Sequence, residues 1–241
     1  MAELILGKDG SGMDIKGNFG ARLCLVLCIC AGQSLATAQD LDEIDDSPLE
    51  ETQFRPEVEM KIKIFKNLDA LLEGRVRVKR EIDFRERTGI ALSWSVNKYL
   101  SLTPSYIFQS EQELHGETEY EHRLRFAATA RLPFKRWRFS DRNLVERRFF
   151  DDGDKQTRYR NRAEVERVFT VKDKDTSVFL ADEVFYESDV KAWTRNRLYL
   201  GARRDFSDRF EAEIYYFRQN GAFDRPRDLH VVGTSFGVRL R

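Results

Sequence analysis

The sequence predicts an all-β protein, a single antiparallel up-and-down transmembrane β-barrel of about twelve strands, with ten as the alternative. Apolar and polar residues alternate with a period of two along residues 54–241, the period at which strand side chains change faces. The alternating segments are roughly 9–14 residues long, and a tilted strand needs ~9–11 residues to cross a bilayer. No long helical pattern separates them, which excludes a βαβ fold.

The front of the chain predicts export. Residues 13–38 have the parts of a Sec-type signal peptide: a basic flank, a short apolar run over 23–31, and a small-residue cleavage site. The apolar run is shorter than the ~20 residues of a membrane-spanning helix. We therefore expect residues 1–38 to be extra N-terminal residues plus the signal, with Met13 as the true start and cleavage after Ala38.

The composition of the exported part excludes some classes of protein. All three cysteines lie inside the predicted signal, so the exported part has no disulfides. The 41 basic and 41 acidic residues balance, which argues against a nucleic-acid binder. Residues 39–53 are acidic and poor in aromatic residues, and we expect a flexible lead-in there. The barrel is expected over 54–241.

Eleven segments along the chain have the strand pattern. The parts of these segments in which the alternation is clearest are 58–64, 75–84, 92–96, 102–108, 123–130, 137–142, 158–166, 176–187, 197–203, 210–216 and 229–240. Segment 176–187 is apolar on both faces, so its inner face is not assigned. Because bacterial single-chain barrels have even strand counts, the odd number leads to the expectation of twelve strands or ten.

The connections between these segments alternate between short and longer ones, as in outer-membrane barrels. Aromatic residues gather beside both kinds and predict two interfacial girdles. The set beside the short turns is Tyr99, Phe134, Trp137, Phe206 and Phe210. The set beside the longer loops is Phe108, Phe149, Tyr186, Trp193 and Phe217.

The charged face of the strands is the candidate functional surface. If the apolar positions face lipid, the charged ones line a narrow lumen. The candidates are Arg75, Arg77, Arg123, Arg125, Arg158, Arg160, Arg162, Glu164, Glu166, Arg195, Arg197, Arg203, Glu211 and Glu213, with Lys79, Glu59, Glu81 and Asp83 beside them. Arginine forks pair bidentately with carboxylates, which predicts an ion-pair network filling the lumen. The alternative is a narrow small-solute pore favouring anions.

The chain resembles a known family in five pieces rich in R-x-R and E-x-R: residues 121–126, 140–149, 158–167, 179–187 and 195–217. They are similar to the family catalogued as domain of unknown function 2490, regarded as outer-membrane barrels of Gram-negative bacteria. The resemblance implies a place in the cell outer membrane, with the bilayer and the barrel assembly machinery as partners, and no established activity. The final Leu240-Arg241 departs from the terminal aromatic residue of common barrels.

Two other classes stay open. One is a soluble exported β-sandwich that binds a ligand. The other is an outer-membrane lipid hydrolase, which needs a nucleophile beside a histidine base. Of the three histidines, His115 lies in a predicted loop, and His122 and His230 open strands on the apolar face. No Gly-x-Ser-x-Gly motif or metal-ligand spacing occurs, so we expect no enzyme, cofactor or metal site.

Overall fold

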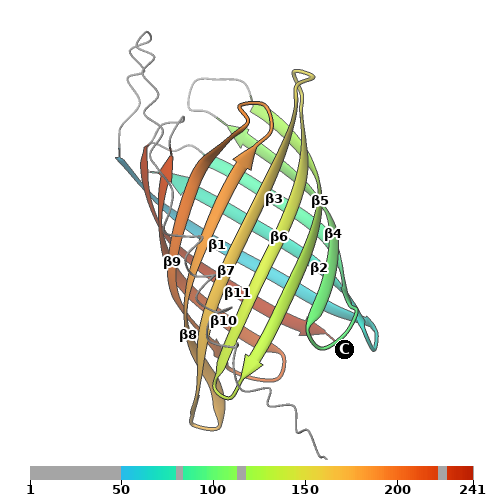
Figure 1. The fold of residues 1–241 in the computed structure, drawn as a ribbon, viewed down its shortest axis with the longest axis vertical. Coiled ribbons are helices and arrows are strands. Elements are labelled where there is room, and N and C mark those ends of the chain that lie inside the picture. The colour runs from blue at the N-terminus through green and yellow to red at the C-terminus, as the bar shows by residue number, and fades with distance from the viewer. Residues whose placement is uncertain (1–49, 80–83, 113–117, 222–226, 241) are drawn as a thin grey trace, which may run out of the picture. The chain divides into compact units, whose positions relative to one another are not determined.

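The computed structural model describes residues 50–79, 84–112, 118–221 and 227–240. The predicted signal, Met13, most of the acidic lead-in, His115, Glu81, Asp83 and Arg241 lie outside these residues. The described residues form eleven strands (Figure 1). They are β1 Glu50–Phe65, β2 Leu68–Lys79, β3 Phe84–Ser95, β4 Leu100–Gln112, β5 Thr118–Phe134, β6 Trp137–Phe150, β7 Lys155–Val171, β8 Lys174–Glu187, β9 Ala192–Asp205, β10 Phe210–Gly221 and β11 Asp228–Leu240. Among the described residues no helix is long and apolar enough to cross a membrane.

The strands close into one barrel, and the closure corrects the expected strand count and pairing. Neighbours in the chain pair antiparallel, but β1 and β11 pair parallel, from Glu50 opposite Asp228 to Ile62 opposite Leu240. An odd number of up-and-down strands leaves the first and last pointing the same way, so the seam must be parallel. The expectation of twelve strands or ten rested on the even strand counts of bacterial barrels and was wrong, because eleven strands close the barrel. The all-β barrel itself is confirmed.

The two faces of the wall differ sharply in chemistry. Large apolar side chains point outward, such as Leu200, which is 60% exposed, and Phe236, which is 53% exposed. Charged side chains fill the inside, where Glu146 and Glu183 are fully buried. The structure also assigns the segment that the alternation left open: Phe179 and Phe185 of β8 face inward.

One part of the outer wall is polar. Asp141 and Asn143 of β6, Asn161 of β7, Asp182 of β8 and Asn196 of β9 point away from the lumen. Their side chains form hydrogen bonds with one another. Asn161 Nδ2 donates to Asp141 Oδ1 at 2.6 Å, and Asn196 Nδ2 donates to Asp182 Oδ1 at 2.5 Å. The patch is therefore largely satisfied within itself.

The connections between consecutive strands are short at both ends of the barrel. At the end where β1 finishes, two to four residues join the strands; at the other end, four to six do. The difference in length that the sequence predicts is present but small. Lys172 and Asp173 both have positive φ, at 53° and 58°, the backbone of a two-residue type I′ hairpin turn. In a four-residue turn, Asn97 Oδ1 accepts from the backbone N–H groups of Tyr99 and Leu100.

Most of the aromatic residues expected in the girdles lie on the outer face. The five beside the short turns are exposed. In the other set Phe217 is the exception: it is buried, and its ring lies inside the barrel between the guanidinium groups of Arg55 and Arg197. The assignment of Phe217 to the outer girdle was wrong, because a position near a loop does not fix which face a side chain takes.

Candidate functional site

The candidate charged residues lie on the inner wall of the barrel. Those that line its cavities are Arg75, Arg77, Arg123, Arg125, Arg158, Arg160, Arg162, Glu166, Arg195, Arg197, Arg203, Glu211 and Glu213, with Glu59 beside them. Glu164 joins them through its ion pairs with Arg203, at 2.7 Å, and Arg162, at 2.9 Å. The Lys79 side chain lies outside the described ones. The register brings these residues together in three layers along the barrel.

The middle layer is centred on Glu183 of β8. Its carboxylate lies 2.7 Å from Arg160 Nη2, 3.0 Å from Arg142 Nη2 and 3.8 Å from Arg197 Nη1. The Tyr199 hydroxyl also donates to it at 3.1 Å. Three strands, β6, β7 and β9, thus place four donor side chains around one fully buried carboxylate. Such a carboxylate is stable only because every side of it faces a positive group or a donor.

The layer toward the end of β1 is centred on Arg203 of β9. Its guanidinium contacts Glu164 of β7 and Glu213 of β10, and lies 3.5 Å from Glu166. Glu213 is the direct cross-strand neighbour of Arg203 in the ladder. Opposite charges on neighbouring strands attract across this short distance, so one arginine ties three strands together here.

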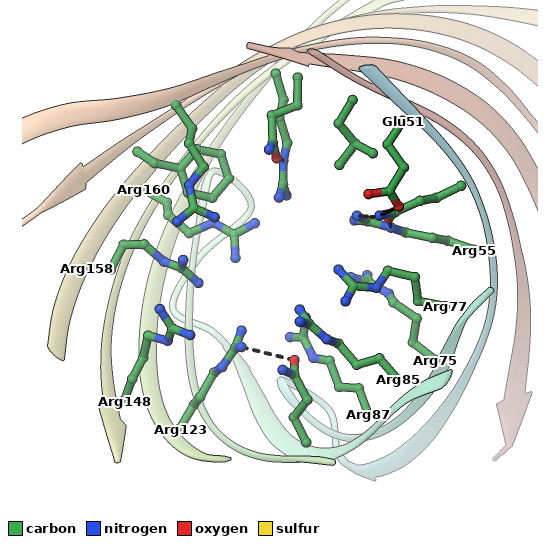
Figure 2. A pocket seen from close by; sticks show the side chains of 17 residues that line it. Glu51, Arg55, Arg75, Arg77, Arg85, Arg87, Arg123, Arg148, Arg158 and Arg160 are labelled. Carbon is green, nitrogen blue, oxygen red and sulfur yellow. Dashed lines mark hydrogen bonds between the residues drawn. The ribbon is translucent and has the colours of Figure 1, made fainter. Parts of the chain in front are cut away.

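The layer at the end where β1 begins is different, because arginine dominates it. A cavity of about 320 Å³ is lined there by eleven arginines and one acidic residue, Glu51. Figure 2 shows the side chains converging on a shared central space from opposite walls of the barrel. We call this cavity the arginine chamber. Its arginines are Arg55, Arg75, Arg77, Arg85, Arg87, Arg123, Arg148, Arg158, Arg160, Arg195 and Arg197.

Carboxylates outside the chamber lining neutralise only part of this charge, because several are shared. Glu111 of β4 pairs with both Arg77 and Arg85. Glu121 of β5 pairs with both Arg123 and Arg148. In the described residues, seven such carboxylates serve ten of the eleven arginines. Among the described residues, the chamber therefore has more guanidinium groups than carboxylates.

Aromatic rings hold several of these arginines in place. The Phe185 ring lies under the guanidinium groups of Arg160, at 4.7 Å, and Arg197, at 4.5 Å. The Phe217 ring lies 5.1 Å from both Arg55 and Arg197. Stacking on a ring is favourable for a guanidinium group and leaves its N–H edge available to other partners.

Sequence reasoning missed part of this site. Arg55, Arg85, Arg87, Arg142 and Arg148 line the lumen but were not among the candidates. The signal was present, because each follows the same every-second-residue pattern as its strand. The expected segments were drawn too short to include four of these five positions. The shared carboxylates Glu183 and Glu187 were missed because segment 176–187 had no assigned inner face.

Further space continues along the lumen. A second cavity of about 410 Å³ shares Arg55, Arg75, Arg87, Arg160 and Arg197 with the arginine chamber, so the two adjoin. A third, of about 140 Å³, lies at the Arg203 layer and shares Glu213 with the second. The cavities therefore follow one another along the inside of the barrel, with the ion-pair layers between them.

The two described histidines lie outside the lumen. Tyr106 Oη and His122 Nδ1 are 2.6 Å apart, and Tyr216 Oη and His230 Nδ1 are also 2.6 Å apart. The second histidine lies 3.2 Å from Glu50 as well. Each is thus a member of a tyrosine–histidine pair on the outer face, as the sequence pattern indicated for its face.

Comparison with known proteins gives a family match. No curated protein matches the chain. A family model described as a protein of unknown function, DUF2490, matches residues 53–230, a stretch that runs from the first strand into the last and includes all three layers of the lumen. The chain therefore belongs to the DUF2490 family.

Proposed function

We propose that the protein is an outer-membrane β-barrel whose lumen is a narrow passage for small anions, braced by ion pairs. The observation that carries this proposal is the inverted polarity of the wall. Thirty-three large hydrophobic side chains are exposed on the described surface, while arginine and glutamate fill the interior. A soluble protein rarely exposes an apolar patch beyond a few hundred Å², whereas a lipid-facing wall requires one.

The barrel itself meets the main demand of a hydrocarbon environment. Closure leaves no strand edge, so the backbone groups of the wall find partners within it. The polar patch on β6 to β9 also satisfies its own side chains, as Asn161 does by donating to Asp141 and Asn143. Isolated polar groups would be expensive there; hydrogen-bonded ones are less so.

The size of the lumen supports passage of small solutes only. Eight strands enclose just enough room for side chains, and 16–18 leave an open aqueous channel. Eleven strands lie between these cases. The cavities of about 320, 410 and 140 Å³ provide room for water and small ions between the ion-pair layers.

The positive charge of the arginines on the lumen wall supports the passage of anions. Rings of arginine favour anionic solutes in a pore, and the arginine chamber stands at one end of the cavity series. A purely structural lumen is the second candidate, favoured by the fully buried Glu146 and Glu183 and their shared arginines. In that case the ion pairs hold the barrel shut.

Planar-bilayer recording separates these candidates. The pore predicts conductance steps for the wild type and a reversal potential in a salt gradient that shows anion preference. Arg218→Gln is the matched control, because this exposed arginine pairs with Asp228 outside the lumen. A silent wild type with steps only in Arg160→Ala or Glu213→Ala contradicts the pore and supports a sealed lumen.

Membrane insertion needs its own test. We expect the chain to fold only in detergent or lipid and to migrate faster on gels when unheated, as folded barrels do. A compact monomer that stays soluble in plain buffer would rule out the membrane barrel and restore the soluble exported protein.

A further inference from the structure

Three neighbouring strands place arginines side by side in the arginine chamber. The ladder puts Arg77 of β2 directly opposite Arg85 of β3. On the other side of Arg77, the pairs Phe54 with Val78 and Glu57 with Arg75 bracket Arg55 of β1 at the matching level. Like charges at opposing positions are destabilising. This row therefore carries an unfavourable repulsion that Glu111, at its β4 end, offsets for Arg77 and Arg85 only.

Arg55 is the member of the row that the protein leaves without a carboxylate among the described residues. Its guanidinium bonds to Gln53 Oε1, at 2.7 Å from Nη2 and 3.2 Å from Nε, and stacks on Phe217. The residue is only 7% exposed, yet it lines the chamber. A buried guanidinium held by an amide and a ring is oriented without being neutralised, which is the state of an anion-binding group before its ligand arrives.

Strands β5 and β6, which lie beyond β4, repeat this placement of like charges side by side. Arg123 of β5 lies directly opposite Arg148 of β6, and Glu121 serves both. In Figure 2 Arg148 and Arg158 lie across the open space from Arg55 and Arg77. The chamber thus presents positive groups from two sides to a single volume.

We propose that the arginine chamber binds a compact soluble polyanion with at least two phosphate or carboxylate groups, one for each wall. The volume of about 320 Å³ equals about ten waters at ~30 Å³ each, which suits a molecule of the size of pyrophosphate or a small polycarboxylate. This inference rests on the proposed function only in that the chamber lies in the lumen of a folded barrel; it does not require conduction.

Isothermal titration calorimetry on the chain folded in nonionic detergent tests the site, with inorganic pyrophosphate as the probe at low ionic strength. The site predicts saturable binding near one pyrophosphate per chain, weakened by added salt as charges are screened. Arg55→Gln removes one unneutralised cation and no carboxylate partner, so we expect binding at least about tenfold weaker. Arg218→Gln removes the same charge from an exposed pair and should bind as the wild type does.

A conservative variant distinguishes a loss of binding from a loss of folding. Arg55→Lys keeps the charge but loses the two-pronged donor, and should weaken binding less than Arg55→Gln. Unsaturable heats, or equal affinities for Arg55→Gln and Arg218→Gln, would overturn the site. Citrate in place of pyrophosphate tells whether carboxylates serve as well as phosphates; chloride alone at the same ionic strength should not bind saturably.

The acidic residues that precede β1 provide a decisive comparison. Residues 40–49 contain five Asp or Glu, and the chain enters the barrel beside the chamber, where Glu51 lines it. A variant with these five changed to Asn or Gln should bind pyrophosphate as the wild type does. Binding that appears only in this variant would overturn the proposal, because the chain's own acidic segment would then occupy the chamber.

The binding and conduction tests fail independently. Pyrophosphate binding in detergent without conductance in bilayers would leave the site intact and remove the pore. Anion-selective conductance without pyrophosphate binding would leave the pore intact and remove the site.

Discussion

Replacing Glu183 with Gln tests whether the middle ion-pair layer braces the barrel. The substitution keeps the side-chain shape but removes the negative charge facing Arg160, Arg142 and Arg197, at 2.7, 3.0 and 3.8 Å. At an effective dielectric of about 20, unit charges about 4 Å apart interact with roughly 4 kcal/mol. The cost of burying the carboxylate offsets much of its combined attraction to the three arginines. Removing one partner of a buried pair costs about 3–5 kcal/mol, which is the loss in the free energy of unfolding we expect.

Urea titration of the folded barrel in detergent micelles measures this loss, followed by the fluorescence of the outer-wall tryptophans. Glu211→Gln is the matched control. It makes the same change near the barrel end, where the Glu211 side chain is 42% exposed and pairs with Arg239, and should lower the free energy of unfolding by less than about 1 kcal/mol because water screens the pair. A loss below about 1 kcal/mol for Glu183→Gln, or equal losses for both variants, would refute the bracing role.

Four further outcomes are expected. Gly233→Ala should lower the unfolding free energy by about 1–3 kcal/mol in the same titration, because a Cβ there would clash with the Tyr215 ring, whereas Gly74→Ala, with nothing within 4 Å, should be close to neutral. Asn161→Leu should destabilise the barrel by about 1–3 kcal/mol, since Asp141 loses its donor at 2.6 Å; an unchanged urea midpoint would contradict this. Brominated lipids should quench the three tryptophans, all exposed on the outer wall, and unquenched emission would count against lipid contact. No phospholipid hydrolysis is expected from the wild type in a fatty-acid release assay, and activity lost when both outer-face histidines become alanine would reverse that expectation.

The local sequence pattern was sufficient to divide most of the wall residues between its two faces. Alternation at period two is a property of neighbouring residues, so the sequence by itself determined that Leu198 and Leu200 share one face and Arg197 and Arg203 the other. Arg203 and Glu213 were both expected to point inward, but their direct cross-strand pairing is given only by the register of β9 and β10. Where one strand carries apolar residues on both faces, as in segment 176–187, the period alone does not show which face points inward.

Closure and charge sharing were decided only by the tertiary structure. The parallel seam between β1 and β11 joins residues nearly 180 positions apart, and no local pattern specifies that contact. The same holds for the lumen. That Glu183 gathers arginines from three other strands, and that Arg55 meets Gln53 and a ring but no carboxylate among the described residues, follows from eleven registers acting together. Sequence determines which side chains face inward; the closed barrel determines which of them meet, because only closure brings distant strands within ion-pair distance.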